Sequence, residues 1–409
     1  MFNQYKGLRR EMYVLFFGRI VTNMGALIWP MLTLILRNKL GLSASDVATV
    51  MLVMTAVQIP ITLLGGKLAD RFNKRNIIIF CDLVTVVCYL ICGFIEVSFM
   101  FVILFFIAGL FASIEWPCYD ALVADLSSSS DREKAYSLNY LGANIGLVLA
   151  PTIGGFLFEN YLNLAFIFNA ISTLSSTILI FLLIKDISKT KDDIVTSSYE
   201  EDASSKSVFH ILKERKTMLL YLLYVAVSGL VYSQFNFLLP LNMEQLYGAK
   251  GAIYFGLITS VNAVVVIVGT PLLTSLFPKI RDVSKIIIGE ILIVTGLAMY
   301  IFIQGLIPFY FVSIIIFTLG EIASTLGKQP YMTRRIPSSH RGRIGSISYI
   351  GASLFQAIMQ KGVGFLADHY TMQIVWTIIS FMGLICIGVA ICLKLVDKKA
   401  YPLFYQEEK

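Results

Sequence analysis

Charged residues are scarce in this chain: Asp, Glu, Lys and Arg make up 14% of its 409 residues. A soluble domain usually carries about 25% of these residues, so a chain whose surface faces only water is excluded. Hydrophobic residues make up 57% of the sequence, as expected of helices that face lipid. The composition therefore predicts an integral membrane protein.

Residues that build catalytic and metal centres are scarce as well. The chain has three histidines, His210, His340 and His369, and none of its six cysteines stands in a CxxC pair. These residues do not form the spacing of a zinc site or of a nucleophile with its base. We therefore expect no enzyme activity, no bound metal and no cofactor. The alternative from another class is a membrane enzyme or a receptor that does not transport.

What the chain has in abundance is long apolar runs. Because each is long enough to cross about 30 Å of hydrocarbon, and because an isolated strand cannot satisfy its backbone in lipid, we expect twelve transmembrane helices in an all-α membrane protein. The runs lie near 12–36, 47–69, 76–95, 98–121, 135–158, 162–184, 217–239, 251–274, 284–304, 307–327, 344–366 and 372–395.

The net charge of +7 follows this topology and does not indicate a nucleic-acid partner. Of the 33 Lys and Arg residues, 28 lie in the termini and in the loops on the same side as the termini. The opposite loops hold only Arg37, Lys39 and Lys250. The positive-inside rule therefore predicts that both termini are cytoplasmic.

The chain divides into two related halves. The longest loop, 185–216, is rich in Lys, Asp, Glu and Ser and is expected to be a solvated linker. At a constant offset of 209 residues, Tyr140 matches Tyr349 and Gly155 matches Gly364. Parallel six-helix repeats are typical of transporters that work by alternating access. The predicted parts are an N-terminal six-helix bundle (1–184), the linker (185–216), a C-terminal six-helix bundle (217–396) and a cytoplasmic tail (397–409).

The loop after the second run reads Gly66-Lys-Leu-Ala-Asp-Arg-Phe-Asn-Lys-Arg75. It resembles the major facilitator loop G-x-L-a-D-R-x-G-R-K/R, with Asn73 in place of a Gly; Asn tolerates a left-handed turn. The resemblance implies a cytoplasmic gate in which a carboxylate meets the positive N-terminus of the eleventh helix, near Gly342. Asp125 is expected to pair with Arg71 or Arg75, and the alternative is a plain basic loop. The predicted gate residues are Gly66, Asp70, Arg71, Arg75 and Asp125.

The fifth run carries small residues and a proline that resemble the family's proton-antiporter signature, G-x-x-x-G-P-x-x-G-G, with Ala150 replacing its second Gly. Small residues allow close helix approach, and the proline is expected to bend the helix. The resemblance implies export against protons. The alternative, that these residues merely pack the fifth and eighth helices together, does not exclude export. The signature residues are Gly142, Gly146, Pro151, Gly154 and Gly155.

Charged residues within the runs are costly in lipid and indicate function. Arg19 and Glu115, on the first and fourth helices, are predicted to meet, either as a structural pair or as a coupling switch. Glu321, with no obvious basic partner at its depth, is predicted to carry protons, and the alternative is a neutral structural acid. Asp82 and Glu290 lie at similar depths of matching helices and are expected to support the gate.

Polar and aromatic residues on the inward-facing helices are the predicted substrate contacts. A mostly apolar cavity with few polar groups suits lipophilic substrates, cations among them. Each residue is also open to the alternative of a helix–helix hydrogen bond. The predicted set is Asn23, Trp29, Trp116, Asn139, Tyr140, Asn144, Tyr232, Gln234 and Asn236.

The resemblance covers essentially the whole chain and is closest to the twelve-helix drug:proton antiporter branch, the bacterial multidrug exporters. It implies a monomeric transporter of a bacterial cytoplasmic membrane, in contact with membrane lipids, that exports amphipathic small molecules in exchange for protons. The alternative within transport is an exporter or proton symporter dedicated to one endogenous metabolite, such as a lipid, peptide, sugar or metallophore.

Overall fold

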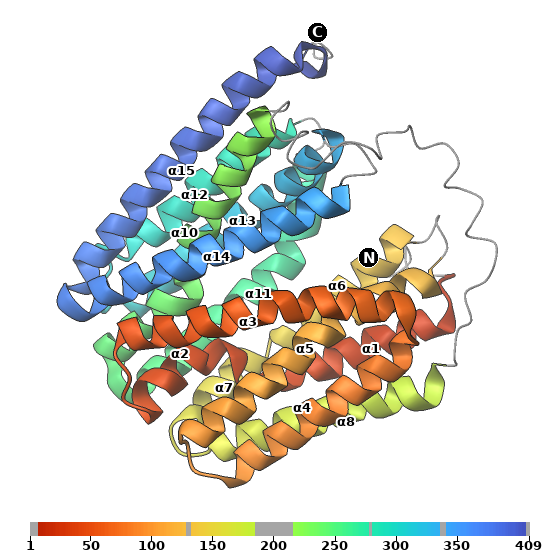
Figure 1. The fold of residues 1–409 in the computed structure, drawn as a ribbon. Helices are drawn as coiled ribbons and strands as arrows, with labels where there is room; N and C mark the ends of the chain where they lie inside the picture. The colour runs from red at the N-terminus through yellow and green to blue at the C-terminus, as the bar shows by residue number, and fades with distance from the viewer. Residues whose placement is uncertain (1–6, 128–131, 185–215, 278–279, 336–340, 406–409) are drawn as a thin grey trace. The chain divides into compact units, whose positions relative to one another are not determined.

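The computed structural model describes residues 7–127, 132–184, 216–277, 280–335 and 341–405. These residues are almost entirely helical (Figure 1). Within them, nine helical segments are long and apolar enough to cross a membrane. The predicted all-α membrane fold is therefore confirmed at this level.

The helices of the first half follow the predicted apolar runs closely. They are α1 (Arg10–Gly25), α2 (Leu32–Leu34), α3 (Ala44–Arg71), α4 (Lys74–Phe94), α5 (Phe99–Leu126), α6 (Arg132–Leu147), α7 (Ala150–Phe158) and α8 (Leu162–Leu183).

Prolines interrupt the first and fifth runs. The first run breaks after Gly25, and the chain resumes at a 3₁₀ turn, Trp29–Met31, that contains Pro30. In the fifth run α6 ends before Pro151, which lies in the first turn of α7. A proline is tolerated there because that N–H has no partner within the helix. Where a bend at Pro151 was predicted, the helix is interrupted just before the proline.

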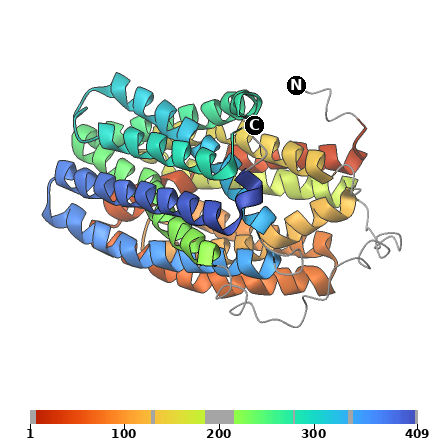
Figure 2. The same ribbon diagram turned by 90° about the horizontal axis from the view of Figure 1, so that it is seen from above.

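The helices of the second half are longer. They are α10 (Lys216–Tyr247), α11 (Gly251–Leu276), α12 (Asp282–Met299), α13 (Ile307–Arg335), α14 (Arg341–His369) and α15 (Met372–Ala400), followed by a 3₁₀ turn (Pro402–Tyr405). α14 and α15 meet at a tight turn in both views (Figures 1 and 2).

The end of α10 differs from the prediction. The helix continues past Pro240 to Tyr247, because prolines are tolerated within membrane helices, and it stops at Gly248. Gly248 has a φ of 53°, the left-handed conformation that commonly ends a helix.

The chain forms two compact units. The first unit comprises Met1–Ser43, Val53–Lys191 and Leu239–Ile267, and the second comprises Ala44–Leu52, Asp192–Leu238 and Val268–Lys409. In the first unit α4 packs on α5 and α8, and in the second unit α12 packs in the same way on α13 and α15. Each unit is thus built mainly from one half of the chain and includes a short segment of the other half.

Candidate functional site

Three charged residues of the first unit, Asp82, which is buried, and Arg19 and Glu115, which are half-buried, gather between α1, α4 and α5. The guanidinium carbon of Arg19 lies 5.0 Å from the ring centroid of Trp116 and 4.9 Å from that of Tyr119, within cation–π range. Arg19 also interacts electrostatically with Glu115 and Asp82. Its Nε has no hydrogen-bond partner among the described residues. The guanidinium therefore lies on aromatic rings, with the carboxylates within electrostatic range.

Asp82, on α4, is buried, with an exposed fraction of 8%. Its Oδ2 lies 2.7 Å from the Thr177 hydroxyl on α8, and it interacts electrostatically with Glu115 on α5. The prediction assigned Asp82 to gate support and did not link it to Glu115. Helix packing links them, because α4 contacts α5 and α8.

Glu290, on α12, is held by several donors of the second unit. It is fully buried, and its Oε1 accepts hydrogen bonds from Tyr224 at 2.6 Å and Ser228 at 2.7 Å. Ser324 donates to the same atom at 3.2 Å, and Lys328 Nζ lies 3.4 Å from it. These partners are those of an ionised carboxylate, since every group around it donates.

Glu321 lies on α13, and its Oε1 accepts a hydrogen bond of 2.9 Å from the Tyr232 hydroxyl of α10. The Tyr232 ring stacks on Phe317 with centroids 5.4 Å apart. Two residues predicted separately, one for proton coupling and one for the substrate cavity, therefore lie together. The sequence alone does not reveal this pairing, because the two residues are far apart in the chain and meet only through the packing of α10 and α13.

The ion pair at the predicted gate loop differs from the one expected from the sequence. Asp125 pairs with Lys74, with Oδ2 2.6 Å from Nζ, and the expected pairing with Arg71 or Arg75 is wrong. Arg75 instead reaches α8, where it donates to the carbonyl oxygen of Phe181 at 2.5 Å. Lys74 stands at the first position of α4, which places its side chain close to the end of α5.

The expected left-handed conformation of Asn73 is also wrong. Its φ is −65°, and its side chain caps α4 by accepting a hydrogen bond from the Asn76 N–H at 3.3 Å. Asn is a favoured N-cap residue, so it fits the loop for a reason other than left-handed tolerance. The predicted contact of Asp70 with the helix start near Gly342 involves side chains outside the described residues.

Gly65, which directly precedes the loop, is the glycine that packs closely against α5. A Cβ on Gly65 would lie 2.8 Å from the Ile114 carbonyl oxygen of α5, whereas one on Gly66 would meet nothing within 4 Å. A pair of adjacent glycines was visible in the sequence, but the face that each presents depends on the packing of α3 on α5.

The signature glycines of α6 and α7 make close backbone contacts. A Cβ on Gly146 would lie 2.5 Å from the Ile20 carbonyl oxygen, and one on Gly154 equally close to that of Leu27. Gly142 likewise faces the backbone of Phe16. The small residues therefore let α6 and α7 pack closely mainly on the first run, in addition to the expected packing on α11.

Gly155 makes the contact with α11. A Cβ there would lie 2.5 Å from the Ala252 carbonyl oxygen. Its repeat counterpart Gly364, in the second unit, faces the Ala44 carbonyl oxygen of α3, at 2.6 Å from a built Cβ. The offset of 209 residues therefore marks equivalent contacts.

Asp368 strengthens the second of these contacts. Its two carboxylate oxygens each accept a hydrogen bond of 2.8 Å, one from the N–H of Ala44 and one from that of Ser45. A carboxylate is stabilised there by the dipole of α3. Sequence reasoning missed Asp368, although its position four residues after Gly364 is one helical turn away.

A second missed cluster joins the ends of α13 and α15. Arg335 and Asp397 form a two-pronged ion pair, with both N–O distances 2.6 Å, and both residues are buried. The Tyr405 hydroxyl donates to Asp397 at 2.7 Å. Burial, and then this hydrogen bond, raises the pKa of Tyr405, so its hydroxyl stays protonated at neutral pH.

The predicted cavity residues fall into three kinds. Gln234 is fully buried, and its Nε2 lies 3.4 Å from Gln360 Oε1 on α14, which favours the helix–helix alternative. Asn139 is buried, and its Oδ1 has no partner among the described residues. The amides of Asn23 and Asn144 donate to the carbonyl four residues earlier in their own helices. The aromatic rings of Trp29, Trp116 and Tyr140, and the side chain of Asn236, are exposed.

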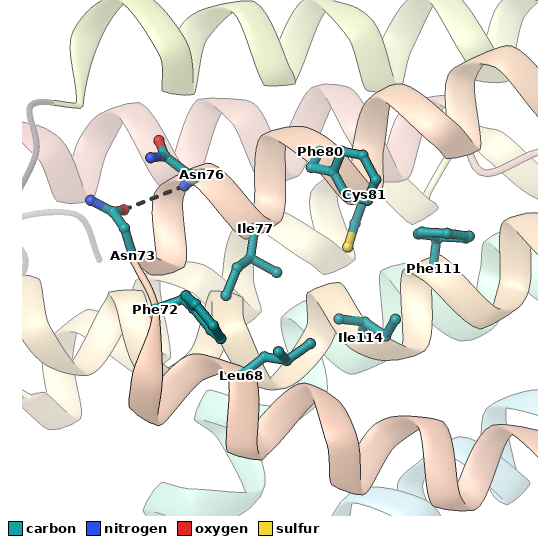
Figure 3. A pocket seen from close by; sticks show the side chains of 9 residues that line it. All are labelled: Leu68, Phe72, Asn73, Asn76, Ile77, Phe80, Cys81, Phe111 and Ile114. Carbon is teal, nitrogen blue, oxygen red and sulfur yellow. Dashed lines mark hydrogen bonds between the residues drawn. The ribbon is translucent and has the colours of Figure 1, made fainter.

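A cavity of about 470 Å³ opens between α3, α4 and α5 (Figure 3). Leu68 and Phe72 of α3 and its following turn, Phe80 of α4 and Phe111 of α5 point into it. None of the predicted cavity residues is among those that line it. Its apolar walls suit a hydrocarbon chain.

Comparison with known proteins places this geometry in a family. The Major Facilitator Superfamily profile matches residues 14–360. The chain is 22% identical over 346 residues to a Na(+), Li(+), K(+)/H(+) antiporter of Planococcus maritimus, covering 78% of this chain and 80% of that protein. It is 30% identical over 190 residues to the quinolone resistance protein NorA of Staphylococcus aureus, covering 45% and 47%.

Among solved structures, a peptide transporter POT in complex with sulfate matches with a TM-score of 0.78 at 15% identity, covering 96% of this chain and 95% of that one. This likeness concerns the fold alone. Transporters of this family are not enzymes and typically need no cofactor. Because the family profile matches most of its length, the chain belongs to the Major Facilitator Superfamily and is a multi-pass membrane transporter.

Proposed function

We propose that this protein is a proton-driven exporter of amphipathic small molecules in a bacterial cytoplasmic membrane. It acts as a monomer by alternating access, with twelve transmembrane helices and both termini in the cytoplasm. Its two six-helix bundles, 1–184 and 217–396, are joined by the linker 185–216. Resemblance to an antiporter and to a quinolone resistance protein supports export by proton exchange.

The observation that carries this proposal is the interrupted helix α6–α7. Its glycines approach the backbones of the first run and of α11, and Pro151 starts its second segment. This combination fits the antiporter signature read from the sequence. Close backbone contacts without side chains let helices pack tightly, as an exporter needs where its bundles are joined.

Twelve spans are consistent with the nine apolar segments of the described residues. One of the nine, Lys216–Leu276, covers both α10 and α11. α12 falls outside the nine and contains Asp282, Lys285 and Glu290 within 18 residues. α14, of 29 residues, is the twelfth. The Lys and Arg distribution then supports cytoplasmic termini.

The direct test is transport into everted membrane vesicles. Respiration acidifies the vesicle lumen, and an exporter then moves dye inward while protons leave. We expect several structurally unrelated cationic dyes to accumulate and each to release protons, seen as recovery of a quenched pH-sensitive fluorophore. Vesicles without the protein are the control. Accumulation of none of the dyes, with a single metabolite transported instead, would support the dedicated-transporter alternative.

Glu321 is the proposed proton carrier of the second bundle, and Arg19 and Glu115 are proposed to take part in coupling. Replacement of Glu321 by Gln keeps the Tyr232 hydrogen bond possible, because the amide oxygen accepts as the carboxylate does. We therefore expect Glu321→Gln to fold but to lose dye accumulation driven by the pH gradient. Undiminished accumulation would exclude this role. Tyr232→Phe is the matched control that removes the hydrogen bond and keeps the acid.

A further inference from the structure

Five positions of the first half correspond to five of the second half at an offset of 208 or 209 residues. In the second half, four of the five residues contact the fifth, Glu290. In the first half, four of the five likewise interact with Asp82. The two halves therefore carry an acidic cluster built on the same plan around a buried carboxylate. The matched residues are Arg19 and Ser228, Asp82 and Glu290, Glu115 and Ser324, Tyr119 and Lys328, and Thr177 and Cys386.

The charges of the two clusters differ. In the second half Glu290 faces Lys328 at 3.4 Å, so one carboxylate meets one cation. In the first half Asp82 and Glu115 share one cation among the described residues, Arg19. With Asp82 buried and Glu115 half-buried, ionising both carboxylates beside one cation is costly, and one of them binds a proton instead.

Other titratable groups around Asp82 do not supply the missing positive charge. α5 contributes Tyr119, Cys118 and Asp120, and α4 itself contributes Cys81. Asp120 adds a further carboxylate that interacts with Arg19 and Glu115. The described residues of α8 contribute Thr177, which does not titrate. Among the described residues, the acidic groups of α4 and α5 together thus outnumber the cation Arg19.

The hydroxyl of Thr177 indicates where the proton lies. It is 2.8 Å from the Thr173 carbonyl oxygen and 2.7 Å from Asp82 Oδ2. A hydroxyl has one hydrogen to donate, and the carbonyl oxygen can only accept it. Thr177 Oγ1 is the donor in both contacts. One hydrogen shared between two acceptors gives Asp82 less than a full hydrogen bond, which stabilises its charged form little and favours a protonated carboxyl. Glu290 Oε1, in contrast, has three hydroxyl donors and the Lys328 ammonium group around it.

We infer that Asp82, Glu115 and Arg19 form a proton-binding site of the first repeat, in which Asp82 is a coupling residue. This inference rests on the proposed proton-driven transport and adds a site to Glu321. When a proton is bound, one carboxylate is neutral and Arg19 rests on the rings of Trp116 and Tyr119. When the proton leaves to solvent, the second carboxylate becomes charged and draws the guanidinium, whose Nε is unpartnered, away from the rings.

Trp116 provides a readout that needs neither substrate nor transport. A guanidinium 5.0 Å from its ring centroid affects indole emission, so movement of Arg19 changes the fluorescence. We would titrate the purified protein with acid and subtract the signal of the Trp116→Phe variant. The wild-type difference is expected to show a titration step. Asp82→Asn and Glu115→Gln are expected to lose this step or to shift its midpoint by about one pH unit or more.

Asp120→Asn is the matched control on α5, because Asp120 also interacts with Arg19, whereas the α5 acid that interacts with Asp82 is Glu115. It should keep the step. Thermal unfolding of each variant checks the fold, and Asp82→Glu, which restores the acid, should recover a step if Asp82→Asn misfolds. A step unchanged in both Asp82→Asn and Glu115→Gln, or one lost only in Asp120→Asn, overturns the inference.

The result of the fluorescence titration does not depend on which molecule the protein transports. A titration step at this site without dye transport in vesicles would reject the proposed export and leave the proton site standing. Dye transport without the step would support the proposed export and reject the site.

Discussion

The two repeats hold a buried acid at matching positions, Asp82 in the first and Glu290 in the second, but the groups around the two acids differ. Glu290 has a lysine and three hydroxyl donors, so it is a fixed, ionised strut between helices. Asp82 has one hydroxyl donor among the described residues, Thr177, and shares its cation with Glu115. One architecture thus supports two uses of a buried carboxylate, and the number of cations nearby decides which one.

A similar contrast holds where the fourth helix of each half ends. At the end of α5, Asp125 pairs with Lys74, and their side chains are 31% and 12% exposed. At the end of α13, Arg335 pairs with Asp397, and their side chains are 5% and 0% exposed. The second unit therefore fixes this end with a buried ion pair, and the first unit with one that solvent reaches.

The largest predicted effect comes from breaking the buried pair. Asp397→Asn leaves the Arg335 guanidinium buried, and it cannot lose its proton. We expect the free energy of unfolding to fall by about 4 kcal/mol, measured by denaturant unfolding in micelles. The matched variant Asp125→Asn should cost only about 0.5 kcal/mol. Equal losses at the two sites would contradict the contrast.

The next effect separates the two acidic clusters. Lys328→Met removes the cation of the fully buried Glu290, and we expect a loss of about 3 kcal/mol. Arg19→Met removes the cation of the first cluster, where the remaining charged carboxylate can also take up a proton, and should cost about 1 kcal/mol. The same unfolding measurement applies. If Arg19→Met destabilised the protein as much as Lys328→Met, its role would be that of a structural ion pair.

The smallest effect tests the equivalent glycine contacts. Gly155→Ala and Gly364→Ala each place a Cβ within 2.5 to 2.6 Å of a carbonyl oxygen, so the helices must separate. We expect each to cost about 2 kcal/mol and to slow dye transport in vesicles. Gly362→Ala, on the same helix as Gly364 but with nothing within 4 Å, should be neutral or stabilising. A matching loss in Gly362→Ala would exclude close packing as the cause.

Much of the fold was predictable from sequence because it depends on local properties. Apolar length marks the helices, Pro151 marks the break before α7, and the 209-residue offset pairs Gly155 with Gly364. The partners of charged side chains were less predictable, because they depend on the rotation of one helix against another. Asp125 therefore met Lys74, one position before the expected Arg75.

The acidic cluster shows the same limit within one site. Arg19 and Glu115 were connected by reasoning from depth in the membrane. Asp82 was assigned to the gate, since α4 is peripheral in the resemblance and its contacts with Glu115 and Thr177 appear only when α4 packs on α5 and α8. Comparing Asp82 with Glu290 at the repeat offset, together with their partners, would have been the signal to follow.

The central claim, that the first repeat holds a proton-binding site at Asp82 and Glu115, is tested most directly by infrared difference spectroscopy of the purified transporter between acidic and alkaline pH. A protonated carboxylic acid has a carbonyl band that a carboxylate lacks, and the band shifts in heavy water. We predict such a band in the wild type and in Glu321→Gln, and a clear loss of intensity in Asp82→Asn. A band of unchanged intensity and position in both Asp82→Asn and Glu115→Gln would contradict the account.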